Sequence, residues 1–166
     1  MSYEYSGLFS VVLSSTLVNK ADLADIVDAL GDSGYRYNQG LLDGTGSGKA
    51  QAHWHDRRTL VESASEDLDL SALLGPHGTV SFTKLKVILV RVATETAGAE
   101  VTVGPASATP FTDVSAVLGP NGILPAGNPV DGWAVTANTN DLLKVANTGT
   151  GSVTYDIVLI GEGSVT

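Results

Sequence analysis

An uninterrupted apolar run of four residues lies near the middle of the chain, at residues 87–90 of the segment 81–104. Its residues are mostly β-branched, and the run is far too short to cross a membrane. Such a run is typical of a strand that is covered on both faces. Lys84 and Lys86 precede it and Arg91 follows it, so we expect the ends of the strand to reach water. This segment is the predicted centre of the fold.

A regular alternation of apolar and polar residues occupies residues 3–15. It predicts an amphipathic strand or an extended arm, although Leu8 and Val12 add apolar side chains to the polar side. The apolar side chains on one face of this arm are those of Tyr3, Tyr5, Phe9, Val11 and Leu13. Two arrangements remain open. The arm pairs within its own sheet, or it adds as a strand to the exposed sheet edge of a neighbouring subunit.

Residues 19–30 carry the spacing of a helix. Asn19 is a suitable N-cap, and Gly31 is a suitable residue to end the helix. The apolar stripe consists of Leu23, Ile26, Val27 and Leu30, and the other face holds Asp22, Asp25 and Asp28. We therefore predict one helix, whose acidic face lies in water or meets a basic partner.

Turn residues organise the rest of the chain. Residues 34–48 are rich in glycine and predict a hinge, so we divide the chain into 1–48 (N-terminal arm, helix and glycine-rich hinge) and 49–166 (β-sandwich domain). Later runs predict strands at 50–62, 68–70, 123–124 and 133–136, and a hairpin whose strands 142–146 and 153–160 flank the turn 147–152. Many short strands imply an all-β protein, a jelly-roll-like β-sandwich with a short N-terminal arm and one helix.

Composition narrows the possible functions. A chain of 166 residues with 43% hydrophobic residues is long enough to form one ordinary domain with a real core. The formal net charge of −9 disfavours binding to nucleic acid or to an anionic membrane. The absence of cysteine excludes disulfides, thiolate metal ligands and cysteine nucleophiles. The first residues show no basic leader before an apolar segment, so we expect synthesis and assembly in the cytosol.

Two motifs invite a chemical interpretation. Residues 44–49, GTGSGK, are similar to a phosphate-binding loop but lack both its first glycine and its final Ser or Thr. His53 and His55 would project from one face of a strand, as the metal ligands of a cupin do. The cupin pattern then fails, because Val130 occupies the position of a later histidine and the acid expected four or five residues after His55 is missing; Glu62 lies seven residues beyond it. We therefore predict a protein that is not an enzyme, without catalytic, cofactor-binding or metal-binding residues and without a cofactor.

Two segments carry a family resemblance: HWHDRRTLVESASEDLDL at residues 53–70 and DLLKVANTGTGSVTYDIVLIG at residues 141–161. In these segments the sequence resembles the capsid decoration, or cement, proteins of tailed bacteriophages. The resemblance implies a homotrimer of β-sandwiches on the outer surface of the virion, assembled in the host cytoplasm. It also implies that the partner is the major capsid protein, whose neighbouring capsomers the decoration protein bridges, and that neither nucleic acid nor a membrane is bound.

The apolar arm and the resemblance to decoration proteins together indicate candidate interface residues. They are Tyr3, Tyr5, Phe9, Val11 and Leu13 of the arm, with Trp54, Arg57 and Arg58 of the sandwich. Tryptophan and arginine are enriched at binding hot spots, although core packing is an equal alternative for Trp54. Asp56 beside the two arginines predicts a surface or intersubunit ion pair. The alternative functions are a tail or head-fibre structural protein, a cupin-like metal-binding enzyme and a sugar-binding sandwich.

Overall fold

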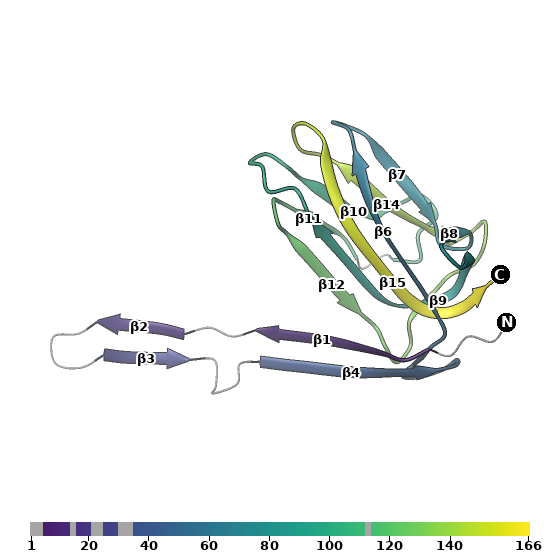
Figure 1. Ribbon diagram of the computed structural model, residues 1–166, viewed down its shortest axis with the longest axis horizontal. Coiled ribbons are helices and arrows are strands. Elements are labelled where there is room, and N and C mark those ends of the chain that lie inside the picture. The colour runs from purple at the N-terminus through teal and green to yellow at the C-terminus, as the bar shows by residue number, and fades with distance from the viewer. Residues whose placement is uncertain (1–4, 14–15, 21–24, 30–34, 112–113) are drawn as a thin grey trace.

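A computed structural model describes residues 5–13, 16–20, 25–29, 35–111 and 114–166 of the chain. All regular structure in these ranges is β-strand, and most strands pair antiparallel (Figure 1). No helix in the described ranges is long and apolar enough to cross a membrane. The all-β prediction is therefore confirmed.

A six-stranded sheet forms the larger layer of the body. Its order is β12 (Ile123–Gly127), β9 (Gly78–Val92), β15 (Val153–Val165) and β6 (Ala52–Leu60), and the short strands β8 (Leu73–Gly75) and β13 (Trp133–Ala134) also pair with β9. Val87, Ile88 and Val90 of β9 are all buried, although neighbouring residues of a strand face opposite sides of its sheet. The prediction of a central strand covered on both faces holds for these three residues, whereas Leu89 between them is only half-buried.

A four-stranded sheet packs against the first. It is ordered β11 (Ala116–Leu118), β10 (Val101–Pro105), β14 (Leu142–Asn147) and β7 (Ser65–Asp69). The main core lies between the two sheets, where Ile88 and Leu159 of the larger sheet belong to the same buried cluster as Val103 and Leu143 of the smaller. The body is therefore β-sandwich-like, with antiparallel sheets packed face to face.

The predicted C-terminal hairpin is wrong, although both of its strands exist. β14 pairs with β10 and β7, whereas β15 pairs with β6 and β9, so the turn between them crosses from one sheet to the other. Asn147, which is buried, fixes this crossing because its Nδ2 donates to the carbonyl oxygens of Leu60, Val61 and Gly151 at 3.1, 3.0 and 2.8 Å. Turn residues thus identified the turn but not the partners of its strands.

The predicted helix at residues 19–30 is also wrong. β2 (Thr16–Lys20) and β3 (Asp25–Ala29) form an antiparallel pair in which Val18 lies opposite Val27 and Lys20 opposite Asp25. The rest of the predicted helix, residues 21–24 and residue 30, falls outside the described ranges. Short apolar runs fit both the spacing of a helix and that of a strand. The β-branched valines and isoleucine here favour the strand.

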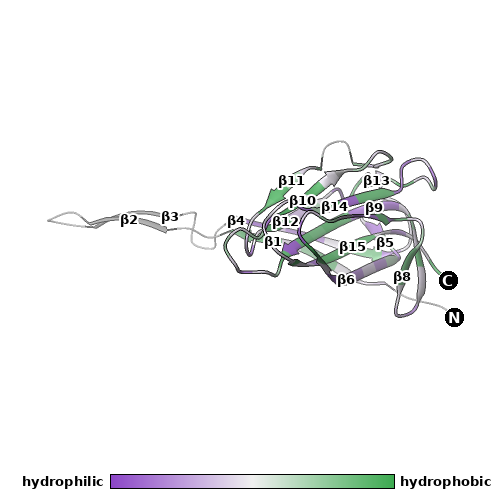
Figure 2. Cartoon of the chain, turned by 90° about the horizontal axis from the view of Figure 1, so that it is seen from above, coloured by the Kyte–Doolittle hydropathy of each residue, from purple (hydrophilic) through white to green (hydrophobic). Residues whose placement is uncertain are grey.

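The N-terminal segment forms an arm that projects from the body. β1 (Gly7–Leu13) pairs antiparallel with β4 (Tyr35–Asp43), from Gly7 opposite Leu41 to Leu13 opposite Tyr35. The pair β2–β3 continues the arm away from the sandwich, as both views show (Figures 1 and 2). The arm therefore pairs with its own chain, and the other edge of β1 carries no partner strand among the described residues.

The hinge prediction over residues 34–48 is wrong for residues 35–43, which form the strand β4, and only residues 44–48 form a loop, which attaches the base of the arm to the body. After β4 the chain passes through residues 44–48 to β5 (Lys49–Ala50), which pairs in parallel with β4. In this loop Gly46 donates its N–H to Glu162 Oε1 at 3.0 Å, and its carbonyl accepts from Lys86 Nζ at 3.1 Å. Gly48 N–H donates to the carbonyl of Pro129 at 3.0 Å. These bonds fix the loop against β9 and β15.

Lys86 is fully buried, so the expectation that it reaches water is wrong. The cause is a β-bulge: Val87 pairs with Ile160 and Leu85 with Gly161, which leaves Lys86 without a partner in the ladder. Its ammonium group lies 3.2 Å from Glu162 Oε1 and also donates to the carbonyl of Val130 at 2.9 Å. The bulge directs this side chain towards the base of the arm.

Candidate interface of the arm and the histidine pocket

The pairing of the strands arranges the side chains on the outer face of the six-stranded sheet in three rows that run across the strands. The first row holds Gly127, Val87, Ile160 and His53, the second Pro125, Leu89, Val158 and His55, and the third Ile123, Arg91, Asp156 and Arg57. The first two rows are apolar over β12, β9 and β15, and the third is mainly charged. This face is opposite to the main core, so something else must cover its apolar rows.

The arm covers the first row. Tyr5 and Phe9 pack with Ile160 against a small buried cluster made by Leu41, Ala50 and Val87. Phe9 approaches so closely that a Cβ at Gly127 would lie 2.6 Å from its ring, which explains why glycine suits this position. The base of the arm is thus docked on the sandwich by apolar contacts.

The second row is left open because the arm and the sheet diverge from their shared base (Figure 1). A groove of about 440 Å³ separates them. One wall is β1 from Leu8 to Val12, and the other is formed by Val87, Leu89, Ile123, Pro125, Val158 and Ile160. Leu8, Val12, Leu13 and Ile123 are all more than half exposed. We call this feature the arm groove.

A charged row borders the arm groove on the sheet. Arg57 donates from Nε to Asp156 Oδ1 at 2.6 Å and from its terminal nitrogen to Oδ2 at 3.1 Å. This hydrogen bonding lowers the pKa of Asp156, and the nearby charges of Arg57 and Arg91 lower it further. Two arginines and one aspartate therefore give the border a net positive charge.

The predicted interface residues of the arm have different environments. Tyr5, Phe9 and Val11 are half-buried on the side facing the sandwich. Leu13 lies on the same face of β1 but is exposed, because it lies beyond the edge of the sandwich. Burial raises the pKa of Tyr5. Tyr3 lies outside the described residues. The alternation predicted the apolar face of the arm, but not that this face would leave the body halfway along β1.

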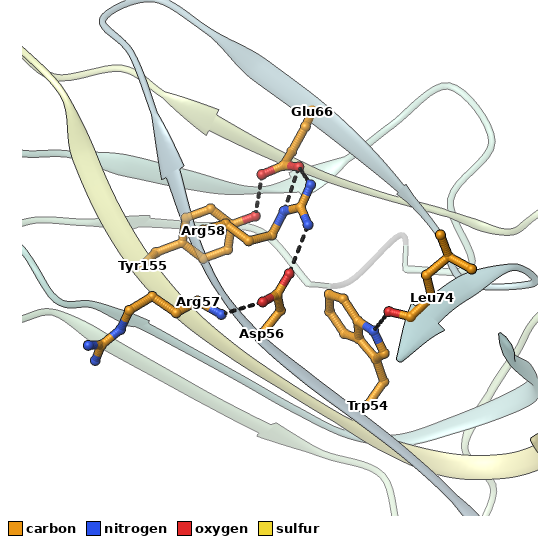
Figure 3. Close-up of polar contacts among 7 residues, drawn as sticks. All are labelled: Trp54, Asp56, Arg57, Arg58, Glu66, Leu74 and Tyr155. Carbon is orange, nitrogen blue, oxygen red and sulfur yellow. Dashed lines mark hydrogen bonds and ion pairs between the residues drawn. The ribbon is translucent and has the colours of Figure 1, made fainter. Parts of the chain in front are cut away.

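Trp54 and Arg58 make contacts within the chain. Trp54 is 4% exposed, belongs to the main core, and donates from Nε1 to the carbonyl of Leu74 at 2.8 Å (Figure 3). Arg58 donates to Asp56 at 2.9 Å and to Glu66 at 2.7 Å, and Glu66 also accepts from the hydroxyl of Tyr155 at 2.6 Å. These contacts support core packing for Trp54 and an ion pair within the subunit for Arg58.

The contacts of Glu66 connect the two sheets of the body. Arg58 on β6 and Tyr155 on β15 belong to the larger sheet, and Glu66 on β7 belongs to the smaller (Figure 3). Burial is the largest cause that raises the pKa of Tyr155 well above its usual range, and the hydrogen bond to Glu66 is the second. The hydrogen bond to Glu66 likewise raises the pKa of Arg58. The network closes one side of the sandwich and is structural.

A second cavity contains all three histidines of the chain. It has a volume of about 340 Å³ and is lined by His53, His55, His77, Tyr5, Trp54 and six further residues. The rings of His53 and His55 are parallel, with centroids 6.1 Å apart, so both project from one face of β6 as predicted. No three His, Cys, Asp or Glu side chains in the described part of the chain are placed to hold a metal ion. The sequence did not signal that the turn containing His77 would join this pocket.

The fold and these surfaces define an all-β protein of packed antiparallel sheets with a projecting arm. No protein-family model, curated protein or solved structure matches the chain. The resemblance to decoration proteins therefore stays a prediction, and the site must be interpreted from its own chemistry.

Proposed function

We propose that the chain is a virion structural protein, a capsid decoration (cement) protein that binds the outer surface of a tailed-bacteriophage capsid. In this role it bridges neighbouring capsomers and stabilises the head as a homotrimer. The observation that carries the proposal is the arm. It is a two-stranded ribbon whose base is fixed to the sandwich and whose surface exposes apolar side chains. Leu8 and Leu42 on this ribbon are 66% and 69% exposed.

The physical chemistry of the arm supports an assembly role. An isolated two-stranded ribbon is at best marginally stable in water, so its projecting half needs a protein surface to cover it. Exposed apolar patches of this kind mark interaction sites in soluble proteins. The body supplies the other requirement, a well-packed scaffold that fixes the direction of the arm through the contacts of Lys86, Glu162 and the loop 44–48.

The remaining features of the proposal concern the body and its location. The two packed sheets are compatible with a jelly-roll-like sandwich, which is the form we propose. The proposed partners are the major capsid protein and further copies of this chain. The net charge of −9 supports a surface that avoids nucleic acid and anionic membranes. The proposed location is the outside of the virion, reached after assembly in the host cytoplasm.

Co-sedimentation with undecorated capsids tests this function. The purified protein should pellet with capsids in a saturable manner and should raise the temperature at which they break. A matched variant with Leu8→Ser and Leu42→Ser should keep its fold, because both side chains are exposed, and should bind less. Absence of pelleting by the intact protein at saturating concentration would exclude the proposal. Binding to isolated tails or fibres in place of capsids would support the alternative of a tail or head-fibre protein.

A second candidate function is favoured by the pocket that collects the three histidines. A cupin-like metal-binding enzyme or a sugar-binding sandwich would use such a pocket. A native mass spectrum with a stoichiometric metal ion, lost on His53→Ala and His55→Ala, would favour this class. A metal-free oligomer that binds capsids would support the decoration function.

A further inference from the structure

We propose that the arm groove receives the tip of the arm, the β2–β3 hairpin, from a second copy of this chain. This inference rests on the proposed function, because it names the contact that builds its homotrimer. The tip cannot reach the groove of its own subunit, since β2 and β3 extend away from the sandwich in both views (Figures 1 and 2). A second copy is therefore needed for the two surfaces to meet.

The arm groove has the walls that an added ribbon requires. Val11 of β1 lies on the side facing the sandwich, and it lines a space of about 440 Å³ together with Leu89 and Val158. Ile123, at the outer end, is 54% exposed. The free edge of β1 offers backbone N–H and C=O groups along a seven-residue strand. A ribbon placed there gains both apolar burial and main-chain hydrogen bonds.

The tip has the matching composition. Its strands carry the sequences TLVNK and DIVDA, so each contributes adjacent apolar residues. Residues 16–33 contain one lysine and four aspartates, a net charge of −3. The border of the groove carries Arg57 and Arg91 against the single carboxylate of Asp156. An acidic, apolar ribbon is therefore complementary in charge to the groove that it would enter.

The two surfaces differ, and this limits the symmetries that the assembly can adopt. A tip that binds a groove makes a heterologous contact, in which the same surface does not meet itself. Heterologous contacts close into rings when the rotation between subunits allows it. The contact is thus compatible with a cyclic trimer, and a two-fold dimer would form only if two copies exchanged their tips reciprocally.

Cysteine cross-linking tests the contact directly, because the chain contains no cysteine. One protein carries Val18→Cys on the tip and the other Val158→Cys in the groove. After mixing and mild oxidation, the two should form a disulfide-linked heterodimer. The matched control replaces the groove variant with Leu74→Cys, whose position is 81% exposed and outside the groove lining. Equal yields in the two mixtures would overturn the inference.

Removal of the tip provides the second test. Because Leu13 lies opposite Tyr35, an Asn-Gly turn in place of residues 14–34 closes the β1–β4 hairpin and retains the groove. This variant should sediment as a monomer, whereas the full chain sediments as a ring. Arg91→Glu in the full chain should weaken the ring by about tenfold or more, and Asp25→Lys with Asp28→Lys should restore it. A ring that persists without the tip, or a full chain that is monomeric, would overturn the inference.

The outcomes separate this inference from the proposed function. A ring that depends on the tip but does not bind capsids would exclude the decoration function and support the contact proposed here. Capsid binding by the full chain, together with a ring that persists in the variant without the tip, would support the decoration function and exclude this contact.

Discussion

The buried ion pair at the base of the arm gives the most quantitative prediction. Lys86 is fully buried, and its ammonium group contacts Glu162 and three carbonyl oxygens, those of Gly46, Pro129 and Val130. The Glu162 side chain is 8% exposed and has one further donor, the N–H of Gly46. The lysine is therefore better satisfied than the carboxylate if the pair is broken.

This difference between the two partners determines how much stability each substitution should remove. Lys86→Met leaves a buried carboxylate with a single hydrogen bond, and removing one partner of a buried pair costs about 3–5 kcal/mol. Glu162→Gln keeps an acceptor for Gly46 and leaves the lysine its carbonyl partners, so we expect a loss of about 1–2 kcal/mol. A domain is stable by about 5–15 kcal/mol, so Lys86→Met removes a large share.

Urea unfolding measures both effects through the fluorescence of the two tryptophans, Trp54 and Trp133. With an m-value of about 2 kcal/mol/M, Lys86→Met should lower the midpoint by roughly 2 M. Hydrogen exchange at Gly46 and Gly48 should also accelerate, because the loop loses its attachment. The double variant should be more stable than Lys86→Met alone, since it leaves no buried charge. A larger cost for Glu162→Gln than for Lys86→Met would show that the lysine, and not the carboxylate, depends more on the pair.

Three further predictions test the body. Gly161→Ala should destabilise the fold by about 3 kcal/mol, because its Cβ would collide with the backbone of β9, whereas Gly40→Ala, with nothing near its Cβ, should be neutral by urea unfolding. Because the folded state raises the pKa of Tyr155, its contribution to stability is full below pH 10, the unfolded value, and falls above it by about 1.4 kcal/mol per pH unit. Tyr155→Phe should lack this alkaline loss in unfolding curves from pH 9 to 11, and an unchanged slope would contradict the assignment. Arg58→Ala should cost about 1–2 kcal/mol after solvent screening, while the exposed Arg57→Ala should leave the unfolding midpoint unchanged, and the reverse order would contradict the roles given to them.

The parts of the fold that local pattern determines were predictable. Residues 87–90 and the strand that became β6 are specified by their own burial and by adjacent turns, whereas the strand predicted at 68–70 overlaps only the end of β7. The helix failed because the apolar spacing of residues 19–30 is too short to separate a helix from a hairpin. Strand pairing at residues 147–152 failed because a turn does not determine which sheet receives the next strand.

The candidate site was predictable only in part. The alternation of residues 3–15 identified the apolar face of the arm, and a same-face pair at His53 and His55 was correctly inferred from the period of a strand. The burial of Lys86 depends on a bulge that alternation cannot foresee. The arm groove depends on Leu89, Ile123 and Val158, which lie far apart in sequence and meet only through sheet register.

Binding to undecorated capsids decides whether this protein decorates a virion. The purified protein would be titrated onto capsids assembled without it, and the bound copies counted by quantitative sedimentation. We expect rings to bind saturably at defined positions, and we expect weaker binding when Leu8 and Leu42 are changed to serine. If the protein stays in the supernatant at every concentration, it is not a decoration protein.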